Sequence, residues 1–66
     1  MSQARTDFSA AAYLRDAQIA EAKAAEWQAA ADAAVAGHPE LVTYCQAEAK
    51  EWKRLSAGWR ECAANA

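Results

Sequence analysis

The sequence predicts an all-α fold in which two antiparallel helices form a hairpin with a coiled-coil-like, alanine-rich seam. Residues 7–36 contain neither glycine nor proline, and Gly37 and Pro39 then fall on either side of His38. Apolar residues recur at alternating spacings of three and four on both sides of this break, which is the pattern of a packed helix pair. We therefore expect a single domain over residues 1–66.

The first helix is expected at about residues 7–36, because nearly every residue there has a high helix propensity. Thr6 or Asp7 can cap its start, since their side-chain oxygens accept hydrogen bonds from the free backbone N–H groups of the first turn. Gly37 is expected to close the helix in the left-handed conformation that glycine adopts at little cost.

A tight turn at residues 37–38 is expected to lead into a second helix at about residues 39–63. Pro39 suits the first helical position, because its missing N–H has no partner there and its φ is already helical. Glu40 follows with a negative charge at the positive end of the helix dipole. Gly58 lies within this helix and costs about 1 kcal/mol relative to alanine.

The expected seams of the two helices differ in the size of their side chains. On the first helix the series is mostly alanine: Ala10, Tyr13, Ala17, Ala20, Ala24, Trp27, Ala31 and Ala34. On the second helix it is bulky: Leu41, Cys45, Glu48, Trp52, Leu55, Trp59 and Cys62. Small side chains facing large ones let two helices interdigitate at the short end of the usual interaxial distance of about 8–10 Å. The sequence therefore predicts that these two seams pack against each other.

Further apolar residues lie away from the expected seams and predict a second interface. They are Phe8, Ala12, Leu14, Ile19, Ala22, Val35, Val42 and Tyr44. A chain this short rarely gains more than about 3–5 kcal/mol from one core, so a partner is expected to add stability. The simplest partner is a second copy, which gives a homodimer with a four-helix arrangement. The alternative is a monomer that docks on another protein.

The histidine and the two cysteines of the chain do not predict a zinc site. On a straight helix Cys45 lies roughly 10 Å from His38 and roughly 25 Å from Cys62, whereas zinc ligands lie within about 2.3 Å of the metal. The same spacing excludes a disulfide between Cys45 and Cys62 of one chain and leaves a disulfide between two chains open. We expect His38 to be a turn residue or helix cap, both cysteines to pack as small apolar residues, and no metal or cofactor to be bound.

The charge pattern argues against nucleic acid as a partner. The net charge is −2, and acidic residues outnumber basic ones in the first helix. Basic and aromatic residues that could stack on single-stranded nucleic acid do gather in the second helix: Lys50, Trp52, Lys53, Arg54, Trp59 and Arg60. Glu51 interrupts this group and can pair with Arg54 along the helix, which favours a solvated face.

Glu48 is the one charged residue of the expected seams. A carboxylate among apolar residues is costly unless it is paired, and catalytic carboxylates are often held in this way. No second carboxylate, histidine or nucleophile falls near Glu48 on the same face. A register-setting contact to a tyrosine hydroxyl or an arginine is the favoured interpretation, and no enzymatic activity is expected.

The expected location is the cytoplasm. The sequence has no run of 18 apolar residues that could span a membrane. Its first residues lack the apolar segment of a secretory signal, so reduced thiols are expected.

In length and in its outline of helix, turn, helix and small seam residues, the chain resembles the Rop family of plasmid primer-RNA regulators. The resemblance implies a hairpin that dimerises into a four-helix bundle, and it carries no binding residue over to this sequence. We expect a small non-enzymatic protein-binding regulator or inhibitor that acts through an apolar helix face. By analogy with other small intracellular regulators, a phage or another mobile element could encode it. The alternatives are a Rop-like regulator that binds RNA or DNA, and a purely structural coiled-coil subunit.

Overall fold

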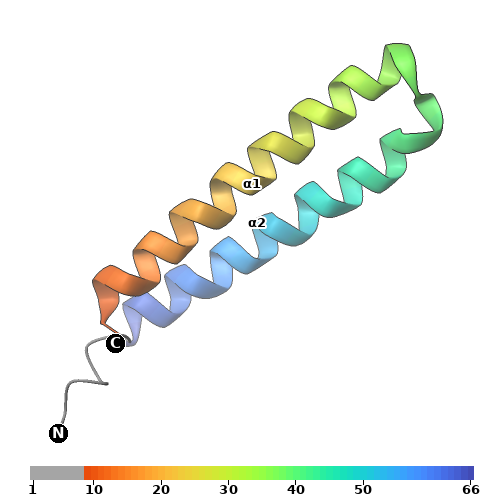
Figure 1. The fold of residues 1–66 in the computed structure, drawn as a ribbon. Coiled ribbons are helices and arrows are strands. Elements are labelled where there is room, and N and C mark those ends of the chain that lie inside the picture. The colour runs from red at the N-terminus through yellow and green to blue at the C-terminus, as the bar shows by residue number, and fades with distance from the viewer. Residues whose placement is uncertain (1–8) are drawn as a thin grey trace, which may run out of the picture.

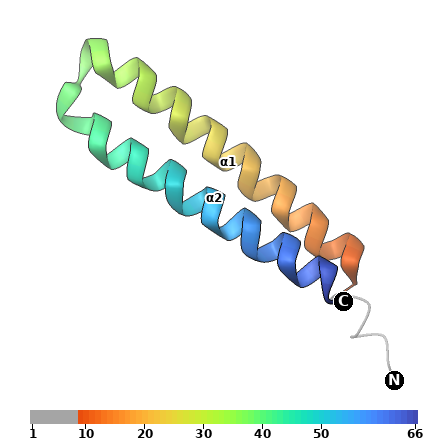
Figure 2. The same cartoon turned by 180° about the vertical axis from the view of Figure 1, so that it is seen from behind.

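The computed structural model describes residues 9–66, which form two α-helices joined by one turn of 3-10 helix (Figure 1). Helix α1 spans Ala10–Gly37, the 3-10 helix η2 spans Pro39–Leu41, and helix α2 spans Val42–Ala64. The two long helices lie side by side and run in opposite directions, so the start of α1 lies beside the end of α2 (Figures 1 and 2). The predicted helical hairpin is therefore confirmed. Neither helix has the length and apolar character needed to cross a membrane.

The start of α1 is capped by Ser9. Its Oγ accepts a hydrogen bond from the backbone N–H of Ala12 at 3.2 Å, and its own backbone is extended. The helix was expected to start at about residue 7, and within the described residues it starts at Ala10. The predicted caps Thr6 and Asp7 lie outside the described residues.

The end of α1 does not use a left-handed glycine, so that prediction is wrong. Gly37 is the last residue of the helix and does not have a positive φ. The chain leaves the helix at His38, with φ −144° and ψ 70°, while the His38 N–H donates to the carbonyl oxygen of Ala34 at 2.8 Å. The extended φ of His38 starts the reversal, and no left-handed residue is needed.

Pro39 opens the return half of the hairpin. It occupies the start of η2, where a backbone N–H would have no acceptor within the helix, so the lack of one in proline costs no hydrogen bond. The N–H of Leu41 donates to the carbonyl oxygen of His38 at 2.8 Å, which closes this tight turn. The first turn of the second half is therefore 3-10 rather than α. Helix α2 ends at Ala64, one residue beyond the expected end.

Small side chains fill the space between α1 and α2. The buried residues are Ala17, Ala20, Ala24, Ala31 and Ala34 on α1 and Cys45, Ala49 and Ser56 on α2. Among the described residues no large side chain is fully buried. Alanine lets the two helix axes approach closely. Large side chains therefore have no room between the helices and lie at the flank of the contact.

On α2 Cys45 is buried as expected, but the other two buried positions fall one residue later than the sequence predicted. Ala49 and Ser56 are buried, whereas Glu48 and Leu55 are half-buried. A helix lined with alanine leaves room for a methyl or hydroxymethyl group at the centre of the contact. It leaves no room there for the larger side chains of Glu48 and Leu55, which therefore lie at the flank of the contact.

Besides Trp59, which is 36 % exposed where it stacks on Tyr13, three further residues of the expected seams are exposed. Leu41 is 45 % exposed, Cys62 is exposed, and Ala10 is exposed at the first position of α1. Leu41 and Cys62 belong to the same displaced series as Glu48 and Leu55, and Ala10 lies where the two helices end. Their placement in the seam was therefore wrong.

Candidate docking face

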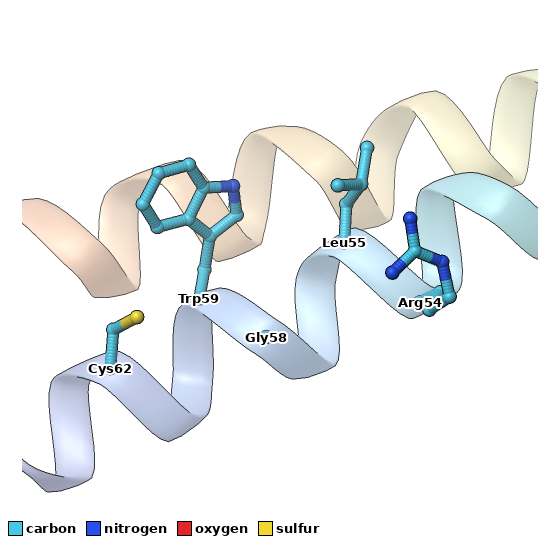
Figure 3. Close-up of a pocket in the computed structure, with 5 residues that line it drawn as sticks. All are labelled: Arg54, Leu55, Gly58, Trp59 and Cys62. Atoms are coloured by element: carbon cyan, nitrogen blue, oxygen red, sulfur yellow. The ribbon is translucent and has the colours of Figure 1, made fainter.

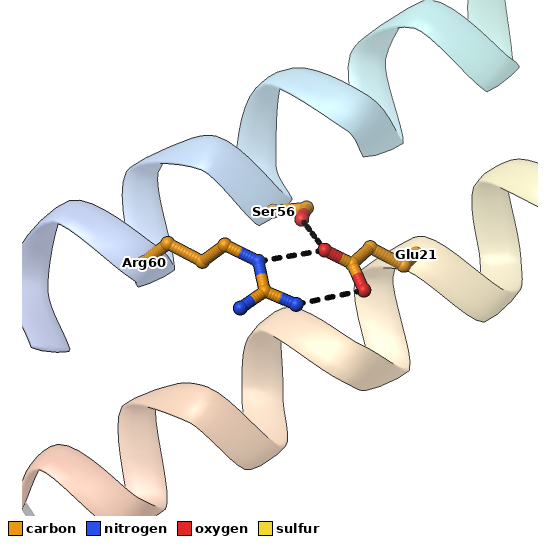
Figure 4. Close-up of polar contacts among 3 residues, drawn as sticks. All are labelled: Glu21, Ser56 and Arg60. Atoms are coloured by element: carbon orange, nitrogen blue, oxygen red, sulfur yellow. Dashed lines mark hydrogen bonds and ion pairs between the residues drawn. The ribbon is translucent and has the colours of Figure 1, made fainter.

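The large seam residues all lie on one side of the helix pair. In an antiparallel pair, corresponding heptad positions of the two helices lie on the same side, because one helix is turned end over end relative to the other. We call one side the aromatic face, which consists of Tyr13, Trp27, Tyr44, Trp52 and Trp59 with the flanking Leu41, Leu55 and Cys62. The opposite side is the polar face, which consists of Glu21, Gln28, Gln46, Lys53, Ser56 and Arg60. Figures 3 and 4 show parts of these two faces.

Two pairs of aromatic rings join α1 to α2 on the aromatic face. The rings of Tyr13 and Trp59 stack with centroids 5.8 Å apart and planes inclined by 25°. Nearer the turn, the rings of Trp27 and Tyr44 meet edge to face with centroids 5.6 Å apart and an angle of 86°. Such pairs each contribute about 0.5–1.5 kcal/mol beyond the area that they bury. The pairs hold the rings in place although Tyr44 is 56 % and Trp59 36 % exposed.

A groove opens on the aromatic face near the end of α2 (Figure 3). It has a volume of about 240 Å³, and its lining residues are Arg54, Leu55, Gly58, Trp59 and Cys62. Gly58 contributes no side chain, so a hollow remains in the surface lined by Arg54, Leu55, Trp59 and Cys62. The groove is therefore an apolar notch with a thiol at one end.

The polar face carries a hydrogen-bonded cluster that joins the two helices (Figure 4). The Oε2 atom of Glu21 accepts from Ser56 Oγ at 2.9 Å and from Arg60 Nε at 2.8 Å, and its Oε1 atom accepts from Arg60 Nη2 at 3.0 Å. The bidentate bond from Arg60 and then the bond from Ser56 lower the pKa of the Glu21 carboxyl below its usual range. The same contact raises the pKa of Arg60. The cluster therefore fixes how far α2 is shifted along α1.

This cluster takes the register-setting role that the sequence suggested for Glu48. Among the described residues, no hydrogen bond or ion pair joins Glu48 to another side chain. Sequence reasoning named Arg60 only within a basic group and did not pair it with Glu21. The available signal was their position: each flanks its seam on the same side, where opposite charges of an antiparallel pair meet.

The residues expected to form a second interface do not gather into one patch. The structure leaves Leu14, Ile19, Ala22, Val35 and Tyr44 exposed and Ala12 and Val42 half-buried. Leu14 and Val35 follow the heptad series of Glu21 and so border the polar face, whereas Tyr44 lies on the aromatic face. Phe8 lies outside the described residues.

Two further contacts between charged groups are local. Arg54 donates from Nε to Glu51 Oε1 at 3.2 Å and from Nη2 to Glu51 Oε2, which confirms the predicted pairing along α2. The bond from Arg54 lowers the pKa of Glu51. His38 Nδ1 lies 3.5 Å from Glu40 Oε2 at the exposed turn. Residues 9–66 contain no group of three or more His, Cys, Asp or Glu side chains that could hold a metal ion.

No protein-family model, curated protein or solved structure matches the chain. The geometry of the aromatic face is therefore the basis on which a function can be proposed.

Proposed function

We propose that the chain is a small non-enzymatic protein-binding protein, a regulator or inhibitor, that docks its aromatic face on an apolar surface of its partner. One observation carries this proposal: all three tryptophans of the chain lie on one face and keep exposed area, while the buried positions are taken by Ala, Cys and Ser. Apolar area left in water is unfavourable by about 25 cal/mol per Å². Tryptophan and tyrosine are also the residues enriched among those that dominate binding energy at protein interfaces.

The arrangement of the cations favours a protein over a nucleic acid. A platform for single-stranded nucleic acid combines exposed rings with a positively charged groove that follows the backbone. Here Arg60 bonds to Glu21 on the opposite face, and Arg54, at the edge of the groove, bonds to Glu51. The aromatic face therefore offers rings without the row of available positive charges that phosphates require.

The groove is suited to a single anchoring side chain. Its volume of about 240 Å³ lies below the roughly 300–1,000 Å³ that is typical of small-molecule sites. An apolar side chain from a partner helix can enter between Leu55, Trp59 and Cys62. This would be the anchor of a helix-in-groove contact, with the surrounding rings excluding water from it.

The test is affinity purification from the native cell with variants of matched chemistry. Leu55→Asp and Cys62→Asp place a charge in the groove, and Val35→Asp places the same charge at a position that borders the polar face and is 64 % exposed. We expect a partner protein to be retained by the wild type and Val35→Asp and lost from both groove variants. Circular dichroism of each variant verifies that its helix content is unchanged.

Two results would contradict the proposal. One is equal recovery of the partner with all four proteins, which would place the contact elsewhere on the hairpin. The other is retention of RNA or DNA that is released by salt and by Lys53→Ala, since that would identify a phosphate-binding surface.

A further inference from the structure

We infer that a second copy of this chain covers the aromatic face, about a two-fold axis parallel to the helices that lays α1 of each copy on α2 of the other. This inference rests on the proposed function, because it takes the aromatic face to be the docking surface. It adds the identity of the occupant and the geometry of the contact.

The first argument is the small amount of apolar surface that one hairpin buries. Its buried residues are alanines, Cys45 and Ser56, and no large side chain among the described residues is fully buried. Domains of this size need further support even when their cores hold large side chains. The rings of Trp27, Trp52 and Trp59 would supply that support in both copies once they leave water. A second copy is the one partner present wherever the chain is made.

The second argument is a pair of opposite charges at the middle of the aromatic face. Lys23 lies three residues after Ala20 and four before Trp27, and Glu48 lies three residues after Cys45 and four before Trp52. They therefore occupy the same flanking position of the two helices, on the side of the large seam residues.

Lys23 and Glu48 also lie at the same height along the hairpin. Both fall between the Tyr13–Trp59 pair and the Trp27–Tyr44 pair, each about ten or eleven residues from the first of these. Glu48 is half-buried, and within residues 9–66 neither Lys23 nor Glu48 makes a hydrogen bond or ion pair with another side chain. A half-buried carboxylate without a counter-charge gains from meeting one.

The direction of the symmetry axis decides what these charges meet. With the axis parallel to the helices, positions at equal height superimpose and α1 lies on α2 of the second copy. Lys23 then meets Glu48 of the second copy, and the symmetry repeats this contact. The same superposition sets Ala20 against Trp52 of the second copy and Trp27 against Cys45 of the second copy, so small side chains meet large ones.

An axis perpendicular to the helices gives the opposite result for the charges. Lys23 lies at the middle of α1 (Ala10–Gly37). Two fully overlapping copies would then place Lys23 on Lys23 and Glu48 on Glu48. Like charges facing each other across an interface are unfavourable, and more so where one of them is half-buried. Charge complementarity therefore selects the parallel axis.

Charge reversal tests the occupant and the axis together, with sedimentation velocity over a concentration series as the measurement. We expect the wild type to dimerise, and Lys23→Glu or Glu48→Lys alone to raise the dimer dissociation constant by roughly tenfold, since symmetry places each change in the interface twice. The double variant Lys23→Glu/Glu48→Lys is expected to restore wild-type dimerisation. An equimolar mixture of the two single variants is expected to form heterodimers. The control Lys53→Glu reverses a charge on the polar face and is expected to leave the dissociation constant unchanged.

Three outcomes would overturn the inference. A wild type that stays monomeric at every concentration would show that no second copy covers the aromatic face. Single charge reversals that dimerise like the wild type would show that Lys23 does not meet Glu48 of the second copy, which contradicts the parallel axis. Dimerisation that is insensitive to Leu55→Asp would show that the two copies meet through another face, whereas the proposed function is contradicted only if the partner protein is also retained by Leu55→Asp. A monomeric wild type that still loses a partner protein on Leu55→Asp contradicts only the inference about the second copy.

Discussion

Gly37 and Gly58 both lie in helical backbone, and neither has a positive φ. A Cβ atom added at Gly58 would meet nothing within 4 Å. The packing of the two helices therefore does not require glycine at this position, although the absent side chain leaves the groove open. For stability, the residue only adds conformational freedom to the unfolded chain. We predict that Gly58→Ala raises the free energy of unfolding by about 0.5–1 kcal/mol.

Urea denaturation followed by circular dichroism measures this effect. Ala57→Gly, at the neighbouring exposed position of α2, serves as the reverse control and is expected to lower the free energy of unfolding by a similar amount. A loss of stability in Gly58→Ala would show that another backbone approaches Gly58 closely in solution.

Glu21 makes the stability of the hairpin dependent on pH. Its folded pKa is lowered by Arg60 and Ser56 relative to the unfolded value of about 4.3. The contact therefore stabilises the fold above about pH 4.3, and this contribution is lost as the pH falls through the folded pKa. We predict that Glu21→Gln lowers the Tm at pH 7 and makes the decline of Tm on acidification shallower.

Thermal melts between neutral and acidic pH measure both effects. Glu26→Gln removes an exposed carboxylate that makes no bond to α2, and it is expected to leave the Tm at pH 7 nearly unchanged. A Glu21→Gln protein with wild-type Tm at pH 7 would show that the contact with Arg60 does not stabilise the helix pair.

At the scale of the helices, the closeness of α1 and α2 depends on alanine. Ala24 is 3 % exposed and faces α2, whereas the next residue, Ala25, is exposed. We predict that Ala24→Leu lowers the free energy of unfolding by about 1–3 kcal/mol, because the added atoms force the helices apart. Ala25→Leu adds the same atoms at the surface and is expected to change stability by no more than about 0.5 kcal/mol.

Chemical denaturation of the two leucine variants provides the comparison. Equal stability of Ala24→Leu and Ala25→Leu would mean that the seam has room for larger side chains. The claim that the close approach of α1 and α2 depends on alanine would then be contradicted.

The buried alanines of α1 could be identified from the sequence, because only one pair of series of small residues recurs there without polar interruptions. The sequence was not sufficient for α2. Two series fit the spacing around Cys45, Trp52 and Trp59: one contains Leu55, and the other contains Ser56. Hydrophobicity favours leucine, but the space left opposite alanine favours the smaller serine, and that space is a property of the packed pair.

The contact of Glu21 with Arg60 could not be predicted for a related reason. Which residues meet across the hairpin depends on how the turn sets α2 along α1. That geometry follows from the extended backbone of His38 and the 3-10 turn Pro39–Leu41, rather than from the left-handed Gly37 that the pattern suggested. A second apolar surface was expected from the apolar residues away from the seams, but the position of the aromatic face depended on the register of α2.

At the scale of the whole molecule, the hairpin has two different sides. On the polar face, Glu21 bonds to Ser56 and Arg60 within the chain. The aromatic face leaves rings and a groove in contact with water. The proposed docking therefore assigns the covering of apolar surface to one side of the hairpin and leaves the other side in solvent.

Tryptophan fluorescence tests this account most directly, because all three indoles of the chain lie on the aromatic face. The emission maximum of the wild type is recorded over a dilution series together with its sedimentation coefficient. We predict that dilution shifts the emission to longer wavelength and reduces the sedimentation coefficient over the same concentration range, as the face becomes exposed. Emission that stays constant while the chain sediments as a monomer throughout would contradict the account of a covered aromatic face.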